Sequence, residues 1–298
     1  MNKTLARVIR KIEQDYDIHI FSDKKYIEAI YLLSFGKKLN LKSPKTFNEK
    51  IQWLKLYDHN PQYTTMVDKF AAKNYVEKII GREYIIDTLG KWDSFDQIDF
   101  EQLPKQFVLK CTHDSGGLVI CRDKEKLDKK KAKGKIEKSL KRNFYYVGRE
   151  WPYKDVKPQI IAERYMEDEK GELKDYKFYC FNGEPQLLYV SKGLENHNTA
   201  RRCFLTMDWE KTPFSRYGYS DFDVIPEKPE KFDEMKRLAR KLSHGQDFLR
   251  VDFYQINGRV YFGELTFYPS SGFVRFYPDE YDEKLGDMLI LHKIKNDK

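Results

Sequence analysis

The sequence predicts an α+β fold, in which a helical N-terminal region precedes strands that pair as antiparallel hairpins. Residues 1–60 have mostly helical patterning. Residues 107–113 and 118–122 are strand-like runs on either side of a short turn, which is typical of a hairpin. Asn182-Gly183 joins two further apolar runs, and this dipeptide is the strongest short-range hairpin signal. Helices combined with hairpins of this kind indicate α+β architecture.

The size and composition fit a folded cytoplasmic protein with an anionic partner. The chain has 298 residues, enough for one large domain or two to three small ones. Its net charge of +8 favours nucleotides, acidic glycans, anionic lipid or nucleic acid without selecting among them. No apolar run approaches the roughly 20 residues of a membrane span. The four cysteines do not form a C-x-x-C pair, so we expect reduced thiols.

The N-terminal segment begins with apolar residues at helical spacing and basic residues between them. We expect a surface helix packed on the core, and the alternative is a basic amphipathic helix that contacts the inner membrane surface. Thr46 and Glu49 have the spacing of a capping box, which predicts a helix start. Asp68 is positioned to cap another helix, from residue 69 to Gly81.

The middle of the chain alternates short strands with a run of charges. Residues 84–92 predict a short strand and turn, and residues 159–166 predict a further strand. The charge run 123–142 predicts a solvated helix with a break at Gly134. A nucleic-acid-binding patch is disfavoured because aromatic residues do not interleave with these lysines, so we expect no nucleic-acid partner.

The C-terminal third contains a loop-rich stretch, an amphipathic helix and a last hairpin. Residues 196–230 carry three prolines and predict loops, and residues 232–245 predict a helix ending at Gly245. The hairpin is FLRVDFYQINGRVYFGELTFYP, residues 248–269, which contains charged residues within strand-like runs. Strand interiors near a core seldom hold charges without a partner or a function.

The register of this hairpin decides which face its charges share. A two-residue turn would place Asp252 and Glu264 on opposite faces, because side chains alternate with period two. A three-residue loop at 257–259 instead sets Asp252 opposite Glu264 and Arg250 opposite Thr266. We therefore predict the three-residue loop. The polar face would then consist of Arg250, Asp252, Tyr254, Phe262, Glu264 and Thr266.

Two carboxylates directly opposite each other repel unless a cation lies between them. Mg²⁺ typically takes one or two carboxylates together with phosphates and waters, so Asp252 and Glu264 predict a magnesium site. Arg250, one step along the strand, is placed to stabilise an anionic oxygen. The alternative is a ladder of surface ion pairs with no function.

A candidate phosphate-binding loop follows Lys110, where Ser115-Gly116-Gly117 joins two strands. Glycines let backbone N–H groups approach a phosphate closely. The loop is not a P-loop, because it lacks that motif and leads into a strand. The alternative is an ordinary hairpin turn.

Several motifs occur in a characteristic order along the chain. They are Asp68-Lys69, Lys110 with its glycine loop, Glu163-Arg164-Tyr165-Met166, Asp175-Tyr176-Lys177, Arg250-Val251-Asp252, and Glu264-Leu265-Thr266 with Pro269-Ser270-Ser271-Gly272. With these motifs the sequence resembles the ATP-grasp superfamily. The stretches LNLKSPKTFNEKIQWLKLYD and GELTFYPSSG resemble its TupA-like, teichuronopeptide-biosynthesis branch. The likeness runs from about residue 30 to about residue 285.

The resemblance implies an ATP-grasp fold with two lobes and ATP between them, preceded by the helical N-terminal region. The implied segments are a helical region (1–65), a segment before the lobes (66–106), a small lobe with the glycine loop (107–162) and a large lobe with the metal site (163–298).

The resemblance also implies roles for the nucleotide-binding residues. Lys69 and Lys110 would contact the phosphates or the adenine edge, although Lys69 and nearby Lys73 have solvated helix lysines as their alternative. Ser115, Gly116 and Gly117 would close over the β- and γ-phosphates. The backbone of Glu163 to Met166 would bind adenine, with Tyr165 packed on the ring.

The remaining implied roles concern ribose, phosphate and metal. Asp175 would hold ribose, and Lys177 would hold the phosphates or an acyl phosphate. Asp252 and Glu264 would ligate Mg²⁺. Thr266 stands where family members usually have asparagine, so it is the departure from the family's metal-ligand set.

The implied activity is an ATP- and Mg²⁺-dependent carboxylate–amine ligase that forms an amide through an acyl phosphate. Arg250 and Lys177 would stabilise the oxyanion. The substrates would be an amino acid and an acidic sugar or precursor of a bacterial surface polysaccharide such as capsule. The alternatives are a metal-dependent glycosyltransferase, for which Asp221-Phe222-Asp223 supplies an Asp-x-Asp motif, and a non-catalytic nucleotide-binding module.

Overall fold

The computed structural model describes residues 21–169, 173–192, 201–218, 220–222 and 224–292. The chain divides into two compact units: unit 1 comprises residues 1–60 and 168–298, and unit 2 comprises residues 61–167. Both units combine helices with antiparallel strands, which confirms the α+β prediction. The N-terminal helix expected before residue 21 lies outside the described residues, and the four-segment division stays a prediction.

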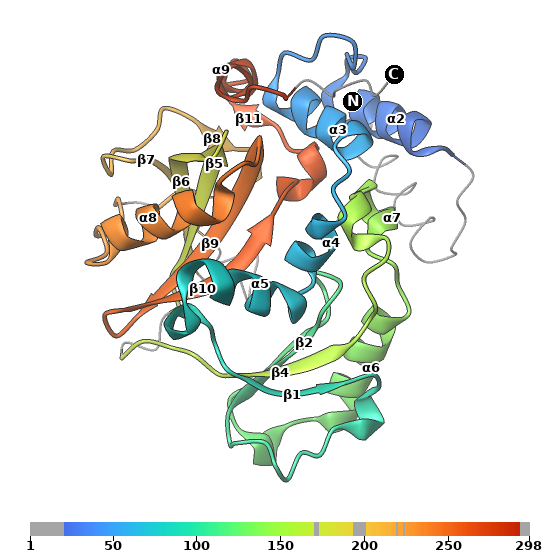
Figure 1. Ribbon diagram of the computed structural model, residues 1–298, viewed down its shortest axis with the longest axis vertical. Helices are drawn as coiled ribbons and strands as arrows, with labels where there is room; N and C mark the ends of the chain where they lie inside the picture. The colour runs from blue at the N-terminus through green and yellow to red at the C-terminus, as the bar shows by residue number, and fades with distance from the viewer. Residues whose placement is uncertain (1–20, 170–172, 193–200, 219, 223, 293–298) are drawn as a thin grey trace. The chain divides into compact units, whose positions relative to one another are not determined.

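Unit 2 is built on a four-stranded antiparallel sheet with the order β1-β4-β2-β3 (Figure 1). Its strands are β1 (Thr88–Trp92), β2 (Phe107–Cys111), β3 (Leu118–Cys121) and β4 (Ile160–Arg164). Its helices are α4 (Gln62–Val67), α5 (Ala71–Ile80), α6 (Lys129–Leu140) and α7 (Tyr145–Gly148). Short 3-10 turns complete it: η1 (Arg82–Tyr84), η2 (Phe95–Gln97), η3 (Lys124–Lys126) and η4 (Trp151–Tyr153).

Helix α6 packs on the sheet of unit 2, and the break expected at Gly134 was wrong. Ala132 and Ile136 are buried in one apolar cluster with Phe107 and Leu109 of β2. The helix continues through Gly134 without interruption. A glycine inside a helix costs about 1 kcal/mol relative to alanine, and burial of the flanking apolar side chains offsets this cost.

Unit 1 is built on a five-stranded antiparallel sheet with the order β10-β9-β5-β6-β7 (Figure 1). Its strands are β5 (Asp175–Phe181), β6 (Glu184–Lys192), β7 (Arg201–Thr206), β9 (Phe248–Ile256) and β10 (Arg259–Thr266). A second small sheet pairs β8 (Ser215–Arg216) with β11 (Phe276–Tyr277). Strands β7 and β8 lie in the stretch expected to be loops, where local signals did not indicate them.

Helices pack on both faces of the large sheet. The helices of unit 1 are α2 (Asp23–Phe35), α3 (Phe47–Tyr57), α8 (Phe232–Ser243) and α9 (Tyr281–Met288), with the 3-10 turn η5 (Pro269–Gly272). On one face, Phe232 of α8 packs on Phe178 with ring centroids 5.9 Å apart. On the other face, Phe47 of α3 packs on Phe248 at 5.0 Å. The predicted capping box of Thr46 and Glu49 begins α3.

The turn of the last hairpin differs from the prediction. Arg259 pairs with Ile256, so the loop has two residues, and the expected three-residue loop at 257–259 is wrong. Asn257 and Gly258 both have positive φ, 48° and 72°. A two-residue turn of this type needs positive φ at both positions, and Asn-Gly is the pair that adopts it most readily.

A β-bulge, and not a three-residue loop, places Glu264 opposite Asp252. The register shifts between Phe262 and Glu264, and beyond this shift Glu264 lies opposite Asp252. The extra residue is Gly263, where an added Cβ would lie 3.1 Å from the carbonyl oxygen of Asp252. Glycine in a strand interior often marks such a bulge. The predicted pairing of the two acids is therefore confirmed, for a different reason.

The bulge also changes which aromatic residue joins the polar face. Tyr261 pairs with Tyr254, and Phe262 pairs with Phe253. Because cross-strand partners share a face, Tyr261 belongs with the polar residues and Phe262 with the apolar ones. The predicted assignment of these two side chains was reversed.

Candidate active site

The predicted site residues fall into two clusters, one in each unit. The cluster in unit 1 comprises Asp175, Lys177, Arg250, Asp252, Glu264 and Thr266, and the one in unit 2 comprises Lys69, Lys110, Ser115, Gly116, Gly117, Glu163, Tyr165 and Met166. We describe each cluster by itself.

The cluster in unit 1 occupies one face of three neighbouring strands. Lys177 of β5 pairs with Asp252 of β9, and Asp175 pairs with Tyr254. On the other side of β9, Asp252 pairs with Glu264 of β10. Cross-strand partners lie about 4.5–5.5 Å apart and point the same way, so the register alone gathers these side chains. Asp252 is 1% exposed, which makes this an interior site.

Asp252 is held by two cations. Arg250 donates from Nε and Nη2 to the two carboxylate oxygens at 2.7 Å each, a bidentate pair. Lys177 donates from Nζ to the same carboxylate and forms an ion pair with Asp175 at 2.7 Å. Four charged side chains therefore form one connected and buried network.

The network fixes the protonation states of its members. Burial alone would raise the pKa of Asp252, but Arg250 and then Lys177 outweigh it and lower the pKa. Burial would lower the pKa of Lys177, but Asp175 and Asp252 outweigh it and raise the pKa. Burial raises the pKa of Asp175, and Lys177 opposes this only in part. Lys177 and Arg250 are therefore cationic, and Asp252 is anionic, at neutral pH.

An arginine lies between the two opposed carboxylates. The Arg250 Nη2 atom is 3.8 Å from the nearer Glu264 oxygen, and the Glu264 side chain is 39% exposed. Repulsion between Asp252 and Glu264 is thus relieved by side-chain cations without a metal. The ladder of ion pairs considered from the sequence is present in part, but it is buried.

The residues offer oxygen donors that would suit a magnesium ion if other ligands completed its coordination. The Glu264 carboxylate is accessible beside Asp252, and Thr266 Oγ1 is buried without a hydrogen-bond partner among the described residues. In that part of the chain, His, Cys, Asp and Glu nowhere gather in threes that could hold a metal. Mg²⁺ needs only one or two carboxylates when phosphates and waters supply the other ligands.

The cluster in unit 2 centres on Glu163. Its carboxylate pairs with Lys73 at 2.6 Å and with Lys110 at 2.5 Å. Burial alone would raise the pKa of Glu163, but Lys110 and Lys73 outweigh it and lower the pKa to about 2. Lys73 also donates to the Ile86 carbonyl at 2.8 Å and to Thr88 Oγ1 at 2.7 Å. The solvated-lysine alternative is therefore wrong for Lys73, because its partners come from distant segments.

Lys69 lies two residues before the observed start of the helix that it was expected to begin. Asp68 caps this helix through bonds from the N–H groups of Phe70 and Ala71, at 2.7 and 2.9 Å, and the helix begins at Ala71. The expected start at residue 69 was therefore two residues early. The Lys69 ammonium donates to the Asp114 carbonyl oxygen, which ties this turn to the start of the glycine loop.

The glycine loop is held by Asp114. Its carboxylate accepts from the Gly117 N–H at 3.0 Å and from the Ser139 hydroxyl. An added Cβ at Gly117 would lie 2.4 Å from Cys111 Sγ, so packing accounts for this glycine. Ser115 and Gly116 are exposed and present the accessible backbone of the loop. The sequence indicates a turn at Asp114-Ser115-Gly116-Gly117, but it gave no sign that Ser139 of α6 would hold this turn.

The segment after β4 carries the expected adenine-binding residues. Tyr165 and Met166 are both partly buried. The Tyr165 hydroxyl accepts from Arg122 Nε at 3.1 Å and donates to Glu167 at 2.9 Å. These bonds fix the ring of Tyr165, whose role toward adenine stays a prediction.

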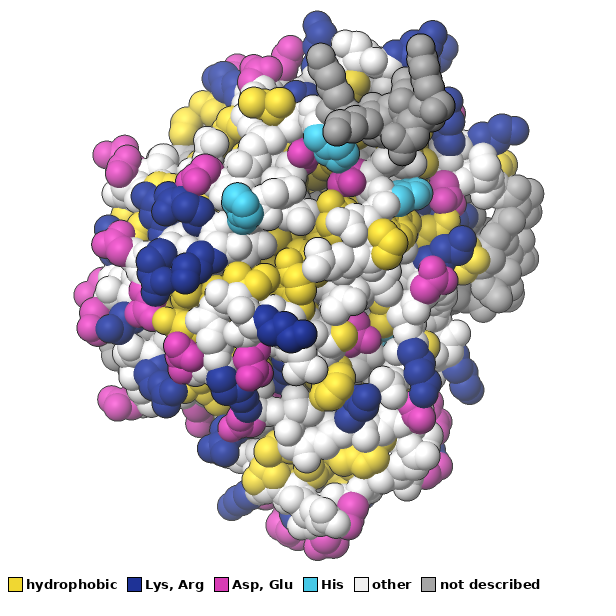
Figure 2. All heavy atoms as spheres, in the orientation of Figure 1, with side chains coloured by type: hydrophobic (Ala, Val, Ile, Leu, Met, Phe, Trp, Pro, Cys, Tyr) yellow, Lys and Arg dark blue, Asp and Glu magenta, His cyan; other side chains and the backbone are white. Residues whose placement is uncertain are grey.

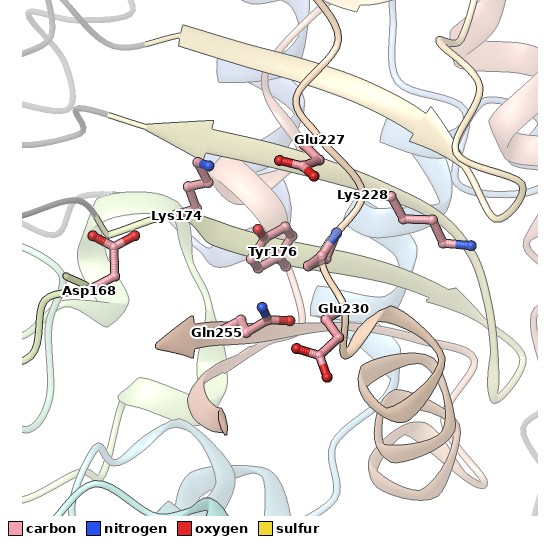
Figure 3. A pocket seen from close by; sticks show the side chains of 8 residues that line it. Asp168, Lys174, Tyr176, Glu227, Lys228, Glu230 and Gln255 are labelled. Carbon is pink, nitrogen blue, oxygen red and sulfur yellow. The ribbon is translucent and has the colours of Figure 1, made fainter. Parts of the chain in front are cut away.

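A separate pocket lies on the other face of the sheet in unit 1. It has a volume of ≈ 240 Å³ and is lined by Tyr176, Gln255, Glu227 and Lys228, among others (Figure 3). Tyr176 alternates with Lys177 along β5, so the pocket and the Lys177 cluster are on opposite faces. The pocket is therefore not part of that cluster.

Two further expectations concern other partners. Asp221 forms an ion pair with Lys211 at 2.8 Å, and Asp223 lies outside the described residues. Figure 2 shows Lys and Arg side chains dispersed among acidic ones on the face in view, without a continuous basic stripe. Among the helices that the structure describes, none has the length and apolar character needed to cross a membrane.

Comparison with known proteins gives one family match. The family described as TupA-like ATPgrasp matches residues 49–290. No curated protein matches the sequence.

Solved structures of ligases are similar over part of their length. The D-alanine–D-alanine ligase of Bacillus anthracis complexed with ATP is 16% identical, with 76% of this chain and 63% of that chain covered and a TM-score of 0.42. The Helicobacter pylori D-alanine–D-alanine ligase is 14% identical, with coverage of 83% and 69% and a TM-score of 0.45. The ATP-grasp ligase PsnB, with a precursor variant, Mg and ADP, is 11% identical, with coverage of 81% and 65% and a TM-score of 0.43. This chain thus spans less than two thirds of the first and third of these ligases.

Proposed function

Since the chain belongs to the TupA-like ATP-grasp family, we propose that it is an ATP- and Mg²⁺-dependent carboxylate–amine ligase. This membership confirms the family resemblance that the motifs indicate, and with it the ATP-grasp fold. The observation that carries the proposed activity is the buried network of Lys177, Asp252 and Arg250 on one sheet face.

The proposed reaction has two steps. A carboxylate oxygen of the first substrate attacks the γ-phosphorus of ATP, ADP leaves, and an acyl phosphate forms. An amine then attacks the acyl carbon, and phosphate leaves with one of the original carboxylate oxygens. Negative charge develops on oxygen in both steps. Lys177 stays protonated and Arg250 is held rigidly by Asp252, so both cations are fixed before the charge appears.

The cysteines do not suit a covalent route. Burial raises the pKa of Cys180 to about 12 and that of Cys111 to about 12, so neither thiol ionises at neutral pH. The thiolate is the nucleophilic form. An acyl phosphate needs no protein nucleophile, which agrees with these buried thiols.

We assign the nucleotide contacts by residue. Lys69, Lys110 and the loop of Ser115 to Gly117 hold the phosphates. Asp175 holds ribose, and its Oδ1 atom is a buried acceptor without a partner among the described residues, as a ribose hydroxyl would require. Residues 163–166 bind adenine, with Tyr165 on the ring.

We assign the metal to Asp252 and Glu264, with Thr266 beside them. When bound, Mg²⁺ would neutralise phosphate charge. The carboxylates and the threonine hydroxyl supply the hard oxygen donors that this cation prefers.

The proposed substrates are an acidic sugar or polysaccharide precursor and an amino acid, joined in the cytoplasm for a bacterial surface polysaccharide. The family resemblance and the net charge of +8 support an acidic substrate. Peripheral contact with the inner membrane surface belongs to the same proposal and would depend on residues before position 21.

A substrate panel tests the proposal. ADP and phosphate release should be measured with ATP over amino acids and uronic-acid sugars, and the product identified by mass spectrometry. We expect ADP and an amide, with ATP affinity reduced about tenfold in Lys110→Ala, since a charge-assisted contact is lost. Lys135→Ala, an exposed lysine of the same unit, is the control. Turnover of a nucleotide-sugar, or ATP binding without turnover of any pair, would contradict ligase activity.

A further inference from the structure

Arg216 is a buried cation without a counter-ion in the part of the chain that the structure describes. It lies on β8, is 6% exposed, and its Nε atom has no hydrogen-bond partner among the described residues. Within those residues no carboxylate forms an ion pair with its guanidinium. Arg250 is similarly buried, at 9% exposure, but both its Nε and Nη2 atoms are bonded to Asp252. The contrast distinguishes an arginine with a structural partner from one without.

Tyr179, whose pKa the charge of Arg216 influences, is a second buried polar group without a partner among the described residues. Its hydroxyl is buried and has no hydrogen-bond partner among the described residues. Burial raises the pKa of Tyr179, and the charge of Arg216 is the strongest influence opposing that shift, which requires the two groups to be close. A buried cation and a buried hydroxyl within electrostatic reach of each other thus both lack a partner in the described part of the chain.

Aromatic residues frame this pair. Phe276 lies opposite Arg216 in the small sheet. The ring of Phe204 is 6.5 Å from that of Phe276 and 5.7 Å from that of Tyr179. Aromatic side chains therefore extend from the strand opposite Arg216 to Tyr179 on β5, the strand that also carries Lys177. An apolar surrounding strengthens any charge interaction made there.

An unpaired guanidinium in this setting is unfavourable unless an anion joins it. Burial of an isolated charge is costly, and arginine cannot relieve the cost by losing its proton. The planar guanidinium matches a carboxylate in a bidentate arrangement. An anion that binds from outside the described residues would supply the partner that Arg216 lacks.

We propose that Arg216, with the Tyr179 hydroxyl, binds a second carboxylate of the substrate, one that is retained through the reaction. The inference rests on the proposed function, in which Lys177 and Arg250 act on the first carboxylate. Tyr179 follows Lys177 by two residues on the same strand face, which sets them about 6.6 Å apart. The substrate thus carries two carboxylates several ångströms apart, either in one small diacid or on neighbouring uronic-acid units.

If Arg216 had only a structural role, its replacement would change the melting temperature in a different direction. An arginine that stabilises the fold through contacts within the chain lowers the melting temperature when it is replaced. An arginine kept for a ligand is uncompensated in the free protein, so an apolar replacement leaves the melting temperature unchanged or raises it.

The experiment compares wild type, Arg216→Met and Arg216→Lys with Arg259→Gln, an exposed arginine of the same unit, as the matched control. Thermal shift and calorimetry without ATP use glutarate as the small diacid and trigalacturonate as the uronic-acid probe. Butyrate, with a single carboxylate, is the control for glutarate, and galactose, which is uncharged, is the control for trigalacturonate. ATP affinity is measured separately, and kcat and KM are measured with any substrate that supports ADP release.

We expect one of the two acidic probes to stabilise wild type and the control, and the probe that does so identifies the source of the carboxylates. Arg216→Met should lose this effect, keep its ATP affinity and its melting temperature, and raise KM for the acidic substrate about tenfold with a smaller change in kcat. Arg216→Lys should recover part of the binding. Equal stabilisation of wild type and Arg216→Met, no stabilisation of either, or a lower melting temperature in Arg216→Met would overturn the inference. The binding measurements decide it even if ligase activity is absent.

Discussion

Replacing Glu163 by glutamine should destabilise unit 2 by about 3 kcal/mol at pH 7. The pKa of Glu163 falls from 4.5 to about 2 because Lys110 and Lys73 outweigh the effect of burial. Each tenfold change in the dissociation constant is about 1.4 kcal/mol, so this fall represents about 3 kcal/mol of folding free energy. Removing one partner of a buried ion pair costs about 3–5 kcal/mol, which agrees. Burial lowers the pKa of Lys73 despite Glu163, which offsets part of the gain and favours the lower figure.

The effect should depend on pH in a defined direction. Because the pKa of Glu163 is lower in the folded than in the unfolded protein, its contribution is complete above about pH 5 and is lost as the pH falls toward 2. Glu163→Gln has no such group to titrate. The stability difference between wild type and variant should therefore be about 2 kcal/mol smaller at pH 3 than at pH 7.

Urea denaturation at both pH values measures these differences, and hydrogen exchange of β2 and β4 amides assigns them to unit 2. Glu101→Gln, which removes an exposed acid of the same unit, is the control and should change stability by less than about 0.5 kcal/mol. A Glu163→Gln protein as stable as this control at pH 7 would refute the reasoning. A difference that grows toward acid pH would refute the sign.

Three further substitutions test unit 1, and a fourth, in helix α6 of unit 2, serves as a comparison. Asp252→Asn should abolish turnover and lower stability by about 3 kcal/mol in calorimetry, because Arg250 and Lys177 lose their shared anion, whereas Glu264→Gln should abolish turnover with little loss of stability. Normal Mg²⁺-dependent activity in Asp252→Asn would contradict the site. Gly263→Ala should cost about 1–3 kcal/mol in urea denaturation, because its Cβ would lie 3.1 Å from the Asp252 carbonyl oxygen, while Gly134→Ala, whose Cβ meets no described atom within 4 Å, should gain about 0.5–1 kcal/mol. Equal effects of the two alanines would argue against the bulge as a constraint.

The last hairpin shows what local patterns determine and where they mislead. The alternation of charged and apolar residues correctly predicted that Asp252 and Glu264 share a face. The predicted loop length was wrong, because the prediction did not combine two signals. Asn257-Gly258 favours a two-residue turn, and Gly263 indicates a bulge. Both signals were present in the sequence, and weighing them together would have given the observed register.

The partners of the charges could not be predicted in this way. Lys73 looks like a solvated lysine until β4 brings Glu163 to it, and Asp252 acquires Lys177 only because β5 pairs with β9. Arg216 lies in a stretch with loop composition, and its burial depends on strands contributed by distant segments. Local propensity sets the elements, but long-range pairing decides which charges are buried together.

Transfer of oxygen from substrate to phosphate tests the proposed reaction most directly. A substrate found active in the panel, labelled with ¹⁸O in its carboxylate, should be incubated with ATP, Mg²⁺ and the amine, and the phosphate analysed by mass spectrometry. An acyl phosphate intermediate requires that each phosphate released carry one oxygen from the carboxylate, and we expect one ¹⁸O per phosphate alongside ADP. Phosphate without label, or release of AMP and pyrophosphate, would contradict the proposed mechanism.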